Sequence, residues 1–348
     1  MKKFILSMVA LMIVTISYAQ NMLVATLTHG DEITMYYGNG ALYQAHNAAQ
    51  SGDVINLSGG SFASVKITKG ITLRGTGIDD VSPTYLSGDF SIEVPSTETN
   101  RLTMEGIRCP GQITMSGDCS NPYFVKCRFT KLYSKSFSMK NATFVNCIIN
   151  NCELNGSGTL QFINSDVTLY RLDSAGALFK NCLFEIGYSG TSYNEIFRSQ
   201  IYNSIIYQTR QTSDIDNSNS SGLSYSKYDF PSSTSCHNCL FIGYKYSIVR
   251  SDSGSSGNYS VHHDDTNAFT KVFKGYEDGG STLFYNYELT DEAKKKYLGD
   301  DGTEVGIYGG VLPYSSIPSY PRITKMNVAN KTTADGKLSV EIEVSAAE

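Results

Sequence analysis

A six-residue pattern recurs along the middle of the chain, between Met104 and Phe241. Each copy starts with an apolar or small residue, has Asn or Gly at its third position in six of seven copies, and ends with another apolar or small residue. Successive copies begin 20, 20, 18, 17, 22 and 35 residues apart, at Met104, Phe124, Phe144, Phe162, Phe179, Ile201 and Cys236. A period near 20 with β-forming side chains is typical of a solenoid.

The third position of the pattern predicts a bend. Side chains in a continuous strand alternate, so the first, fourth and sixth positions cannot all face one core unless the alternation is reset. Asn and Gly tolerate the left-handed backbone that such a reset needs. We therefore expect stacked bends about 4.8 Å apart, whose amides can share hydrogen bonds along the stack. Lys126 interrupts the series and predicts a more exposed bend. The predicted ladder residues are Asn146, Asn164, Asn181, Asn203 and Asn238.

The cysteines follow the same repeat. Four of the eight occupy the fourth position, where the other copies carry Ser165, Ser204 and Ile107. This exchange favours small buried packing residues over disulfides. Cys236 and Cys239 have the spacing of a redox or zinc motif, but both fall on repeat positions, so packing is preferred there too. A disulfide from Cys119 stays open. The fourth-position residues are Cys127, Cys147, Cys182 and Cys239.

The N-terminus has the pattern of an export signal. Lys2 and Lys3 precede an apolar run from Phe4 to Ile16, and small residues flank Tyr18. We predict a signal peptide over residues 1–19 and a periplasmic, cell-surface or extracellular location. The net charge of -5 gives no basic footprint for nucleic acid. No later apolar run is long enough to predict a membrane span.

The start of the repeat region carries a resemblance to a known fold. Ala41 to Ala49 predicts a short amphipathic helix, Val54 to Leu57 a strand, and Gly70 to Gly77 a further coil. These segments resemble the opening of right-handed parallel β-helix proteins of the pectate lyase-like superfamily. The resemblance implies an all-β right-handed parallel β-helix over residues 20–312, with an N-terminal capping helix. Its handedness comes from the resemblance alone.

Two segments are predicted to be insertions between coils, and the C-terminus is predicted to be a tail. Ile78 to Thr99 and Thr209 to Ser235 do not follow the repeat. Thr290 to Gly299 has the end signals of a short helix. Residues 313–348 are predicted to form a linker and a β-hairpin tail, because three prolines precede two strand-like runs between Ile323 and Val344.

The candidate site lies on the strand that follows the second bend of each coil. Tyr133, Glu153 and Arg171 are expected to point outward there, beside Tyr170. The resemblance implies that lyases use several carboxylates holding calcium with a nearby Arg or Lys, whereas hydrolases pair two carboxyls. Glu153 and Arg171 are therefore the catalytic candidates, and a surface ion pair is the plainer interpretation. Candidates for ligand binding by ring stacking are Tyr133, Tyr170, Tyr225 and Tyr228.

Other acidic groups fit a solvated loop better than a site. His262 and His263 in an extended chain point to opposite sides, so the run to Asp265 supplies too few converging metal ligands. Asp214 and Asp216 lie in a Ser-rich segment to which the same applies.

Three hypotheses for function follow. The preferred one is a secreted, non-catalytic β-helix that binds a glycan or another surface partner, with no cofactor. The second is a polysaccharide lyase or glycoside hydrolase acting on an acidic polysaccharide, with calcium only if it is a lyase. It requires two carboxylates within about 10 Å of each other near Glu153. The third is a structural or adhesive surface element.

Overall fold

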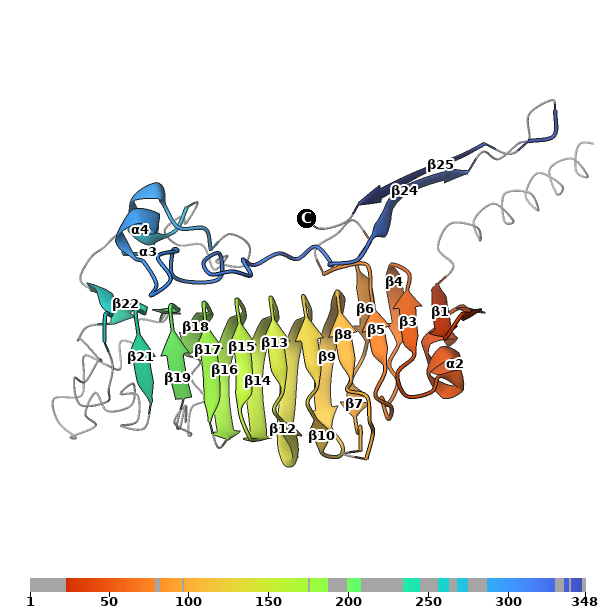
Figure 1. The fold of residues 1–348 in the computed structure, drawn as a ribbon, viewed down its shortest axis with the longest axis horizontal. Helices are drawn as coiled ribbons and strands as arrows, with labels where there is room; N and C mark the ends of the chain where they lie inside the picture. Colours follow the sequence, from red (N-terminus) through yellow and green to blue (C-terminus); the bar gives the residue numbers. More distant parts are fainter. Residues whose placement is uncertain are drawn as a thin grey trace, which may run out of the picture.

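The chain forms a parallel β-solenoid, which confirms the predicted β-helix (Figure 1). The computed structural model describes residues 23–78, 82–95, 97–174, 176–186, 199–207, 234–244, 256–262, 268–274, 287–328, 335–337 and 339–345. Corresponding strands of successive coils pair in parallel, so each sheet grows along the solenoid axis. The registers keep repeat positions aligned, with Phe124 opposite Phe144 and Phe144 opposite Phe162.

Two large sheets make up the described solenoid. The first begins with two antiparallel strands, β1 (Val24–His29) and β2 (Glu32–Tyr37). It continues with the strands before each bend: β3 (Val54–Leu57), β5 (Thr72–Arg74), β8 (Thr103–Glu105), β11 (Tyr123–Val125), β13 (Thr143–Val145), β15 (Leu160–Ile163), β17 (Ala177–Lys180), β19 (Ser199–Tyr202) and β21 (Ser235–His237). The second contains the strands after each bend: β4 (Gly60–Ala63), β6 (Thr84–Ser87), β7 (Phe90–Ile92), β9 (Ile107–Met115), β10 (Cys119–Ser120), β12 (Arg128–Lys140), β14 (Ile148–Ser157), β16 (Asp166–Ser174), β18 (Leu183–Ile186), β20 (Ile205–Tyr207), β22 (Leu240–Tyr244) and β23 (Tyr259–His262).

The bend between the two sheets lies at the third position of the repeat. Its residues adopt positive φ, from 45° at Asn164 to 66° at Gly106. A left-handed residue turns the chain sharply and resets the alternation of side chains. The residues on both sides of the bend can therefore face the same interior. The left-handed bend residues are Gly106, Lys126, Asn146, Asn164, Asn181, Asn203 and Asn238.

The interior is a continuous apolar core. Phe124, Phe144, Phe162 and Phe179 form a column of stacked rings whose centroids are 4.7–5.0 Å apart. All eight cysteines are buried and remain thiols, so no disulfide forms from Cys119. Burial raises the pKa of the Cys119 thiol to about 12. Such thiols are unreactive packing groups.

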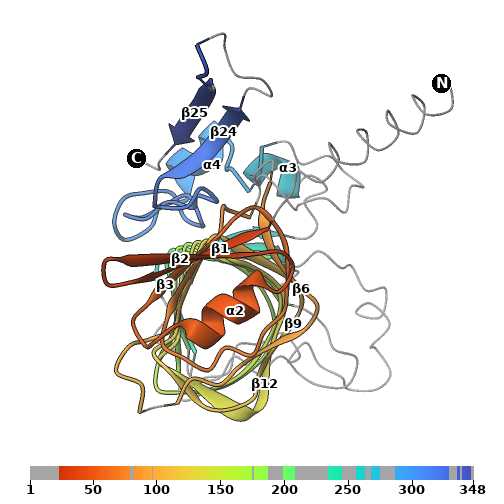
Figure 2. The same cartoon turned by 90° about the vertical axis from the view of Figure 1, so that its right-hand side faces the viewer.

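Helix α2 (Ala41–Ala48) lies across the first coil, and Figure 2 shows it within the outline of the coils seen end-on. Its Ala41, Leu42 and Ala45 are fully buried. Lys69 holds the end of this helix, because its ammonium donates to the carbonyl oxygens of His46 and Ala49, each at 2.7 Å. A cation is favourable where the last helical carbonyls lack partners.

The prediction that Ile78 to Thr99 is an insertion was wrong for most of that segment. The segment from Ile78 to Thr99 contains β6 and β7, which pair in parallel with β9 as part of a coil. Leu86, Phe90 and Ile92 face the core. The coil was missed because a turn with left-handed Gly88 separates two short strands, so no Asn-type bend marks it. The second predicted insertion lies outside the described residues.

The C-terminal region covers the outside of the later coils. Helices α3 (Ala268–Val272) and α4 (Asp291–Lys296) pack over outward-facing apolar residues of β18, β20 and β22. Thr290 caps α4, as predicted, with its hydroxyl accepting from the Ala293 amide at 3.2 Å. This outer core contains Leu183, Ile205, Tyr207, Leu240, Ile242, Val272, Phe273, Tyr287, Leu289, Ala293, Tyr297, Val305 and Ile307.

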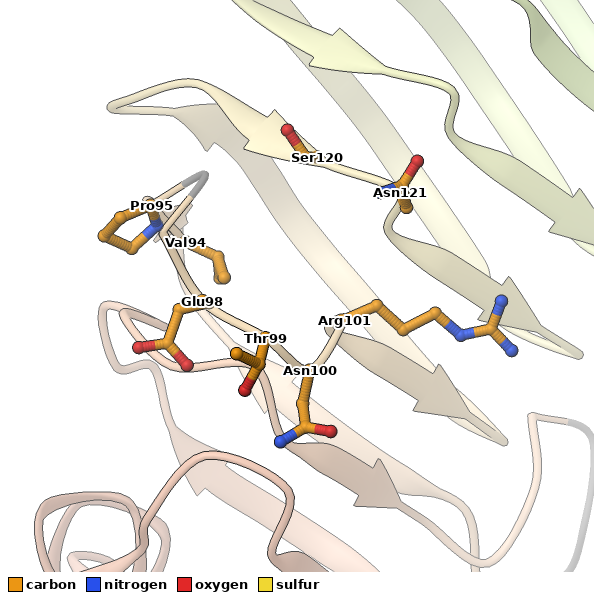
Figure 3. A pocket seen from close by; sticks show the side chains of 8 residues that line it. All are labelled: Val94, Pro95, Glu98, Thr99, Asn100, Arg101, Ser120 and Asn121. Atoms are coloured by element: carbon orange, nitrogen blue, oxygen red, sulfur yellow. The ribbon is translucent and has the colours of Figure 1, made fainter.

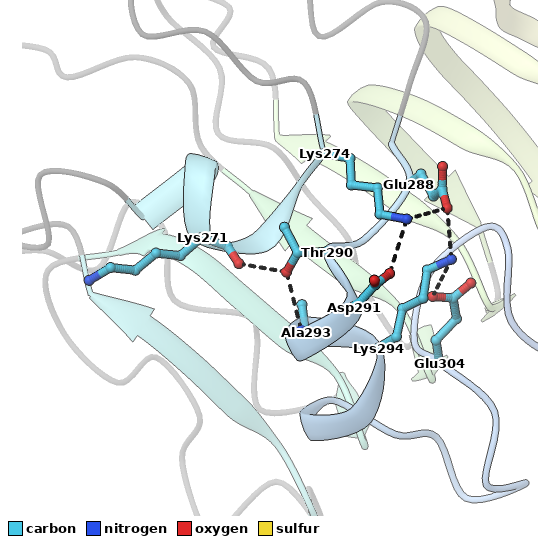
Figure 4. A network of polar contacts seen from close by, with 8 residues as sticks. All are labelled: Lys271, Lys274, Glu288, Thr290, Asp291, Ala293, Lys294 and Glu304. Carbon is cyan, nitrogen blue, oxygen red and sulfur yellow. Dashed lines mark hydrogen bonds and ion pairs between the residues drawn. The ribbon is translucent and has the colours of Figure 1, made fainter.

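A polar network joins the two helices of this cover (Figure 4). Glu288 accepts from Lys274 and from Lys294, each at 2.9 Å, and Lys274 also pairs with Asp291 at 3.1 Å. The hydrogen bonds from Lys294 and Lys274 hold the pKa of Glu288 below its ordinary value. Because several charges share partners, the network fixes α4 relative to α3 better than one surface pair would.

After α4 the chain returns along the solenoid, and we call residues Gly299–Tyr320 the strap (Figure 1). The strap crosses the bends in reverse order, so the predicted linker from Pro313 lies on the stack as far as Tyr320. Its contacts are Asn203 with Asp300 at 2.6 Å, Asn164 with Ile307 at 2.9 Å and with Gly309 at 2.7 Å, Asn146 with Pro313 at 3.5 Å, Lys126 with Ile317 at 2.5 Å, and Glu105 with Ser319 at 2.8 Å.

These contacts correct two predictions about the bends. The amides of Asn146, Asn164 and Asn203 donate to the strap and not to one another along the stack. Lys126 is not at an exposed bend, because only 8% of it is accessible and its ammonium donates to the Ile317 carbonyl. Burial lowers the pKa of Lys126, against the opposing effect of Glu105. The longer lysine side chain reaches the strap where an asparagine does so in later coils.

The strap ends in a hairpin that projects away from the solenoid (Figures 1 and 2). Strands β24 (Arg322–Val328) and β25 (Val340–Ser345) pair antiparallel with each other. Tyr320 anchors the hairpin's base, since its hydroxyl donates to the Gly75 carbonyl and its ring lies 5.2 Å below the Arg74 guanidinium.

Candidate functional site

The outward face of the second sheet carries the candidate residues in register. Thr114 of β9 lies opposite Tyr133 of β12, Tyr133 opposite Glu153 of β14, and Glu153 opposite Arg171 of β16. The neighbouring Ile113, whose side chain faces inward, is fully buried. Because neighbouring strands lie about 4.8 Å apart, these four backbones present one row across four coils.

Lys131 joins this row from the same strand as Tyr133. Its ammonium lies 3.4 Å from a carboxylate oxygen of Glu153 and 4.9 Å from the centre of the Tyr133 ring. The lysine and the glutamate are about one-third exposed, at 34% and 28%. The three side chains therefore form a partly solvated cluster in which cation, ring and carboxylate remain accessible from outside.

A second cation and ring lie on the same sheet nearer the bend. Arg108 of β9 lies opposite Tyr85 of β6, and its guanidinium carbon is 5.4 Å from the centre of the Tyr85 ring. Both side chains are partly exposed. We define the strand face as Tyr85, Arg108, Lys131, Tyr133 and Glu153. It repeats the pairing of a cation with a tyrosine ring, an arrangement in which each ring orients its cation.

The side chains of the strand face are better suited to binding a ligand than to acid–base catalysis. Glu153 is the carboxylate whose side chain is described there, and it is already paired with Lys131. A glycosidase of the usual type needs two carboxyl groups flanking the bond. Calcium takes six to eight oxygen ligands, and no cluster of three or more His, Cys, Asp or Glu occurs in the described part of the chain. These residues do not fit the calcium site that the resemblance to lyases implies.

Several predicted residues cannot be placed as side chains. The backbones of Tyr170 and Arg171 belong to β16, but their side chains lie outside the described set. Tyr225, Tyr228, Asp214 and Asp216 lie wholly outside the described residues, as does the segment from His263 to Asp265. His262 ends β23 opposite Tyr244. The structure therefore brings together Tyr133 and Glu153 and adds Lys131 between them.

Sequence reasoning missed Lys131, Arg108 and Tyr85, although one signal was present. Lys131 stands two residues before Tyr133, and alternate residues of a strand share a face. The signal was not used, because Tyr133 was the one residue of this strand considered for the site, whereas β12 runs from Arg128 to Lys140. Arg108 and Tyr85 lie side by side only because β6 pairs with β9. The prediction that residues 78–99 form an insertion excluded this pairing.

In comparisons with known proteins, no family model, no curated protein and no solved structure matches the chain. None of the helices in the described residues has the length and apolar character needed to cross a membrane.

Proposed function

We propose that the protein is an exported β-helix protein that binds an acidic polysaccharide along the strand face. The observation that carries the proposal is the pair of cation–tyrosine contacts on one sheet, Lys131 with Tyr133 and Arg108 with Tyr85. A sugar ring stacks on a partly exposed tyrosine, and the neighbouring cation then lies within reach of the sugar's acidic group.

Local charge supports an acidic ligand even though the whole chain has a net charge of -5. Two cations and one carboxylate have described side chains on the strand face. The carboxylate, Glu153, is held by Lys131 at the edge of this cluster. A neutral or cationic polymer would leave the Arg108 guanidinium without a charged partner from the ligand.

The fold supports the same proposal. Parallel pairing extends the strand face as a row, so an extended chain can lie across successive coils. The N-terminal pattern supports export, and the resemblance to the pectate lyase-like superfamily supports a polysaccharide ligand. The fold alone does not define an activity, so the proposal stands on the cation–tyrosine pairs.

Binding to immobilised polysaccharides tests this proposal. We expect the purified chain without residues 1–19 to bind acidic polysaccharides and not neutral ones. Tyr133→Ala and Lys131→Ala should each weaken binding about tenfold or more, because a stacked ring or a charge-assisted contact contributes about 1–3 kcal/mol. Lys295→Ala, an exposed lysine on α4, is the control for loss of one charge and should bind normally.

The same mixtures of protein and polysaccharide can be assayed for cleavage products. Equal binding by the wild type and by the Tyr133→Ala and Lys131→Ala variants would reject the strand face as the site. Release of unsaturated ends or reducing ends that disappears in Glu153→Ala would instead establish the enzymatic alternative.

A further inference from the structure

The C-terminal hairpin of β24 and β25 has one apolar face. Apolar and polar pairs alternate along it, so they belong to opposite faces of the hairpin. Val344, on the apolar face, is 61% exposed. A two-stranded hairpin has little stability in water until a third strand or another surface covers its apolar face. The apolar pairs are Ile323 with Val344, Met326 with Ile342 and Val328 with Val340.

Strand β2 presents a second apolar surface, at the first end of the solenoid. Ile33, Met35 and Tyr37 alternate along it and are 64%, 55% and 51% exposed. Tyr36, on the opposite face, packs against the core. Among the described residues β2 pairs on one side only, with β1. Its other edge therefore offers backbone N–H and C=O groups to an added strand.

The hairpin of one copy does not cover β2 of that copy. Tyr320 fixes the base of the hairpin beside β5, because its hydroxyl donates to the Gly75 carbonyl. From there the hairpin projects beyond the end that β1 and β2 form, and it crosses the direction of the coil strands (Figure 1). Figure 2 shows it outside the outline of the coils. Both apolar surfaces are thus open at the same end of the molecule.

Charge selects which edge of the hairpin fits β2. Strand β2 begins with the exposed Glu32. Strand β24 begins with Arg322 and carries Lys325, whereas β25 carries Glu341 and Glu343. Opposite charges on neighbouring strands stabilise their pairing, and like charges oppose it. The edge of β24 is therefore the complementary one.

A parallel alignment of β24 with β2 satisfies both the charges and the apolar pattern. The basic start of β24 then lies at the acidic start of β2. In the same register Met326 lies beside Met35, and Val328 lies beside Tyr37, so the apolar residues of the two strands share one face. Parallel pairing is also how the coils of the solenoid join one another.

We propose that β24 of one copy adds to the free edge of β2 of a second copy, and reciprocally, in a closed dimer. Each chain carries the added strand and the accepting edge at the same end, so one two-fold axis forms both contacts. Backbone hydrogen bonds supply affinity, and the apolar and charged side chains select the strand. The dimer does not depend on the strand face, which lies on the other sheet.

Sedimentation equilibrium of the chain without residues 1–19 measures the dimer directly. We expect twice the mass of one chain. Met35→Glu should weaken the dimer about 100-fold, because a tenfold loss at one contact occurs twice under two-fold symmetry. Val311→Glu is the control, since it charges a 91% exposed apolar side chain on the strap, and it should dimerise as the wild type does. A wild-type chain that stays monomeric up to about 100 µM, or that grows beyond dimers, would overturn the proposal.

A charge exchange tests the choice of β24. Glu32→Lys and Arg322→Glu should each weaken the dimer about fivefold, because like charges then meet at both contacts. The double variant should regain most of the affinity, which a defect in folding would not allow. No effect of either change, or no recovery in the double variant, would contradict the pairing of β24 with β2.

Cross-linking distinguishes a second copy from other occupants. All eight native cysteines are buried, so the thiols introduced by Met35→Cys and Met326→Cys are the accessible ones. In a mixture of the two single variants, mild oxidation should join two chains by a disulfide, and neither variant alone should do so. A disulfide within one chain that carries both changes, without linked pairs, would show that the hairpin folds back on its own β2. That result, or the absence of any cross-link, would overturn the proposal.

Discussion

Two rows of left-handed corners run along the same solenoid and are used differently. At the bends between the sheets, Asn146, Asn164 and Asn203 are at most 5% exposed, and their amides hold the strap. At the second corner Asn121 and Asn141 have the same backbone, with φ of 54° and 52°, but are exposed. There the Asn141 amide donates to Asn121 along the stack at 3.2 Å.

The comparison separates two reasons for asparagine at a corner. Both rows need a residue that tolerates positive φ. Only the row under the strap, which we call the covered row, also needs an amide, because the Ile307 and Gly309 carbonyls are buried against Asn164 and have no water to pair with. We call the exposed corners at Asn121 and Asn141 the open row. The sequence predicted an amide ladder for the covered row, but the contact along the stack forms on the open row, from Asn141 to Asn121.

The largest effect is expected at the centre of the covered row. Asn164→Ala should lower the free energy of unfolding by about 3–5 kcal/mol, since the Ile307 and Gly309 carbonyls lose their donors and alanine is strained at φ 45°. Urea unfolding of the wild type and variant measures this. A loss no larger than that of Asn141→Ala would show that the amide contacts add nothing to the bend.

Lys126→Met should lower stability by about 1–2 kcal/mol. Methionine keeps the length of the side chain and about the same backbone strain, but it leaves the Ile317 carbonyl without its donor. The cost of burying the lysine charge offsets part of the loss. Lys140→Met, at the exposed end of the strand β12 that follows this bend, is the control and should change stability by less than about 0.5 kcal/mol. Equal effects of the two changes would contradict the role of Lys126.

Asn141→Ala should cost about 1 kcal/mol, most of it from the left-handed backbone. The lost hydrogen bonds to Asn121 and Thr159 lie in contact with water, which replaces them. Asn141→Gly removes the same amide without the strain and should recover most of the stability. Failure of glycine to do so would mean that the open row also depends on its amides.

The sequence predicted the part of this comparison that depends on backbone geometry. The reset of alternation at Asn164 follows from local rules, and so does the packing of Cys147 against the interior. The strap could not be predicted, because it contacts Asn164 from residues 143 and 145 positions away in the chain. Nothing in a six-residue repeat shows what covers its outer surface.

The candidate site shows the same division. Tyr133 and Glu153 were placed on one row because strand alternation is local, whereas the ion pair of Lys131 with Glu153 joins side chains of two strands. A hollow of about 410 Å³ that Arg101 and Asn121 both line depends on two loops from different coils, so only the folded chain forms it (Figure 3).

The smallest effect concerns pH and lies away from both rows, at α2. Burial, and then the charge of Lys69, lowers the pKa of His46 from 6.5 in the folded state. The unfolded chain therefore binds the proton more readily, and this stability is present above about pH 6.5 and is lost as the pH falls. Urea unfolding should show a larger loss between pH 7.5 and pH 5.5, roughly the range of histidine titration, in the wild type than in His46→Gln. An equal loss in both would exclude His46 as the cause.

Hydrogen exchange of the strap tests most directly whether the covered row binds it. Asn164→Gly and Asn141→Gly each keep the left-handed corner and remove one amide. We predict that Asn164→Gly accelerates exchange in strap peptides around Ile307 to Pro313, and that Asn141→Gly leaves them as in the wild type. Unchanged strap exchange in Asn164→Gly, or equal acceleration in both variants, would contradict the account.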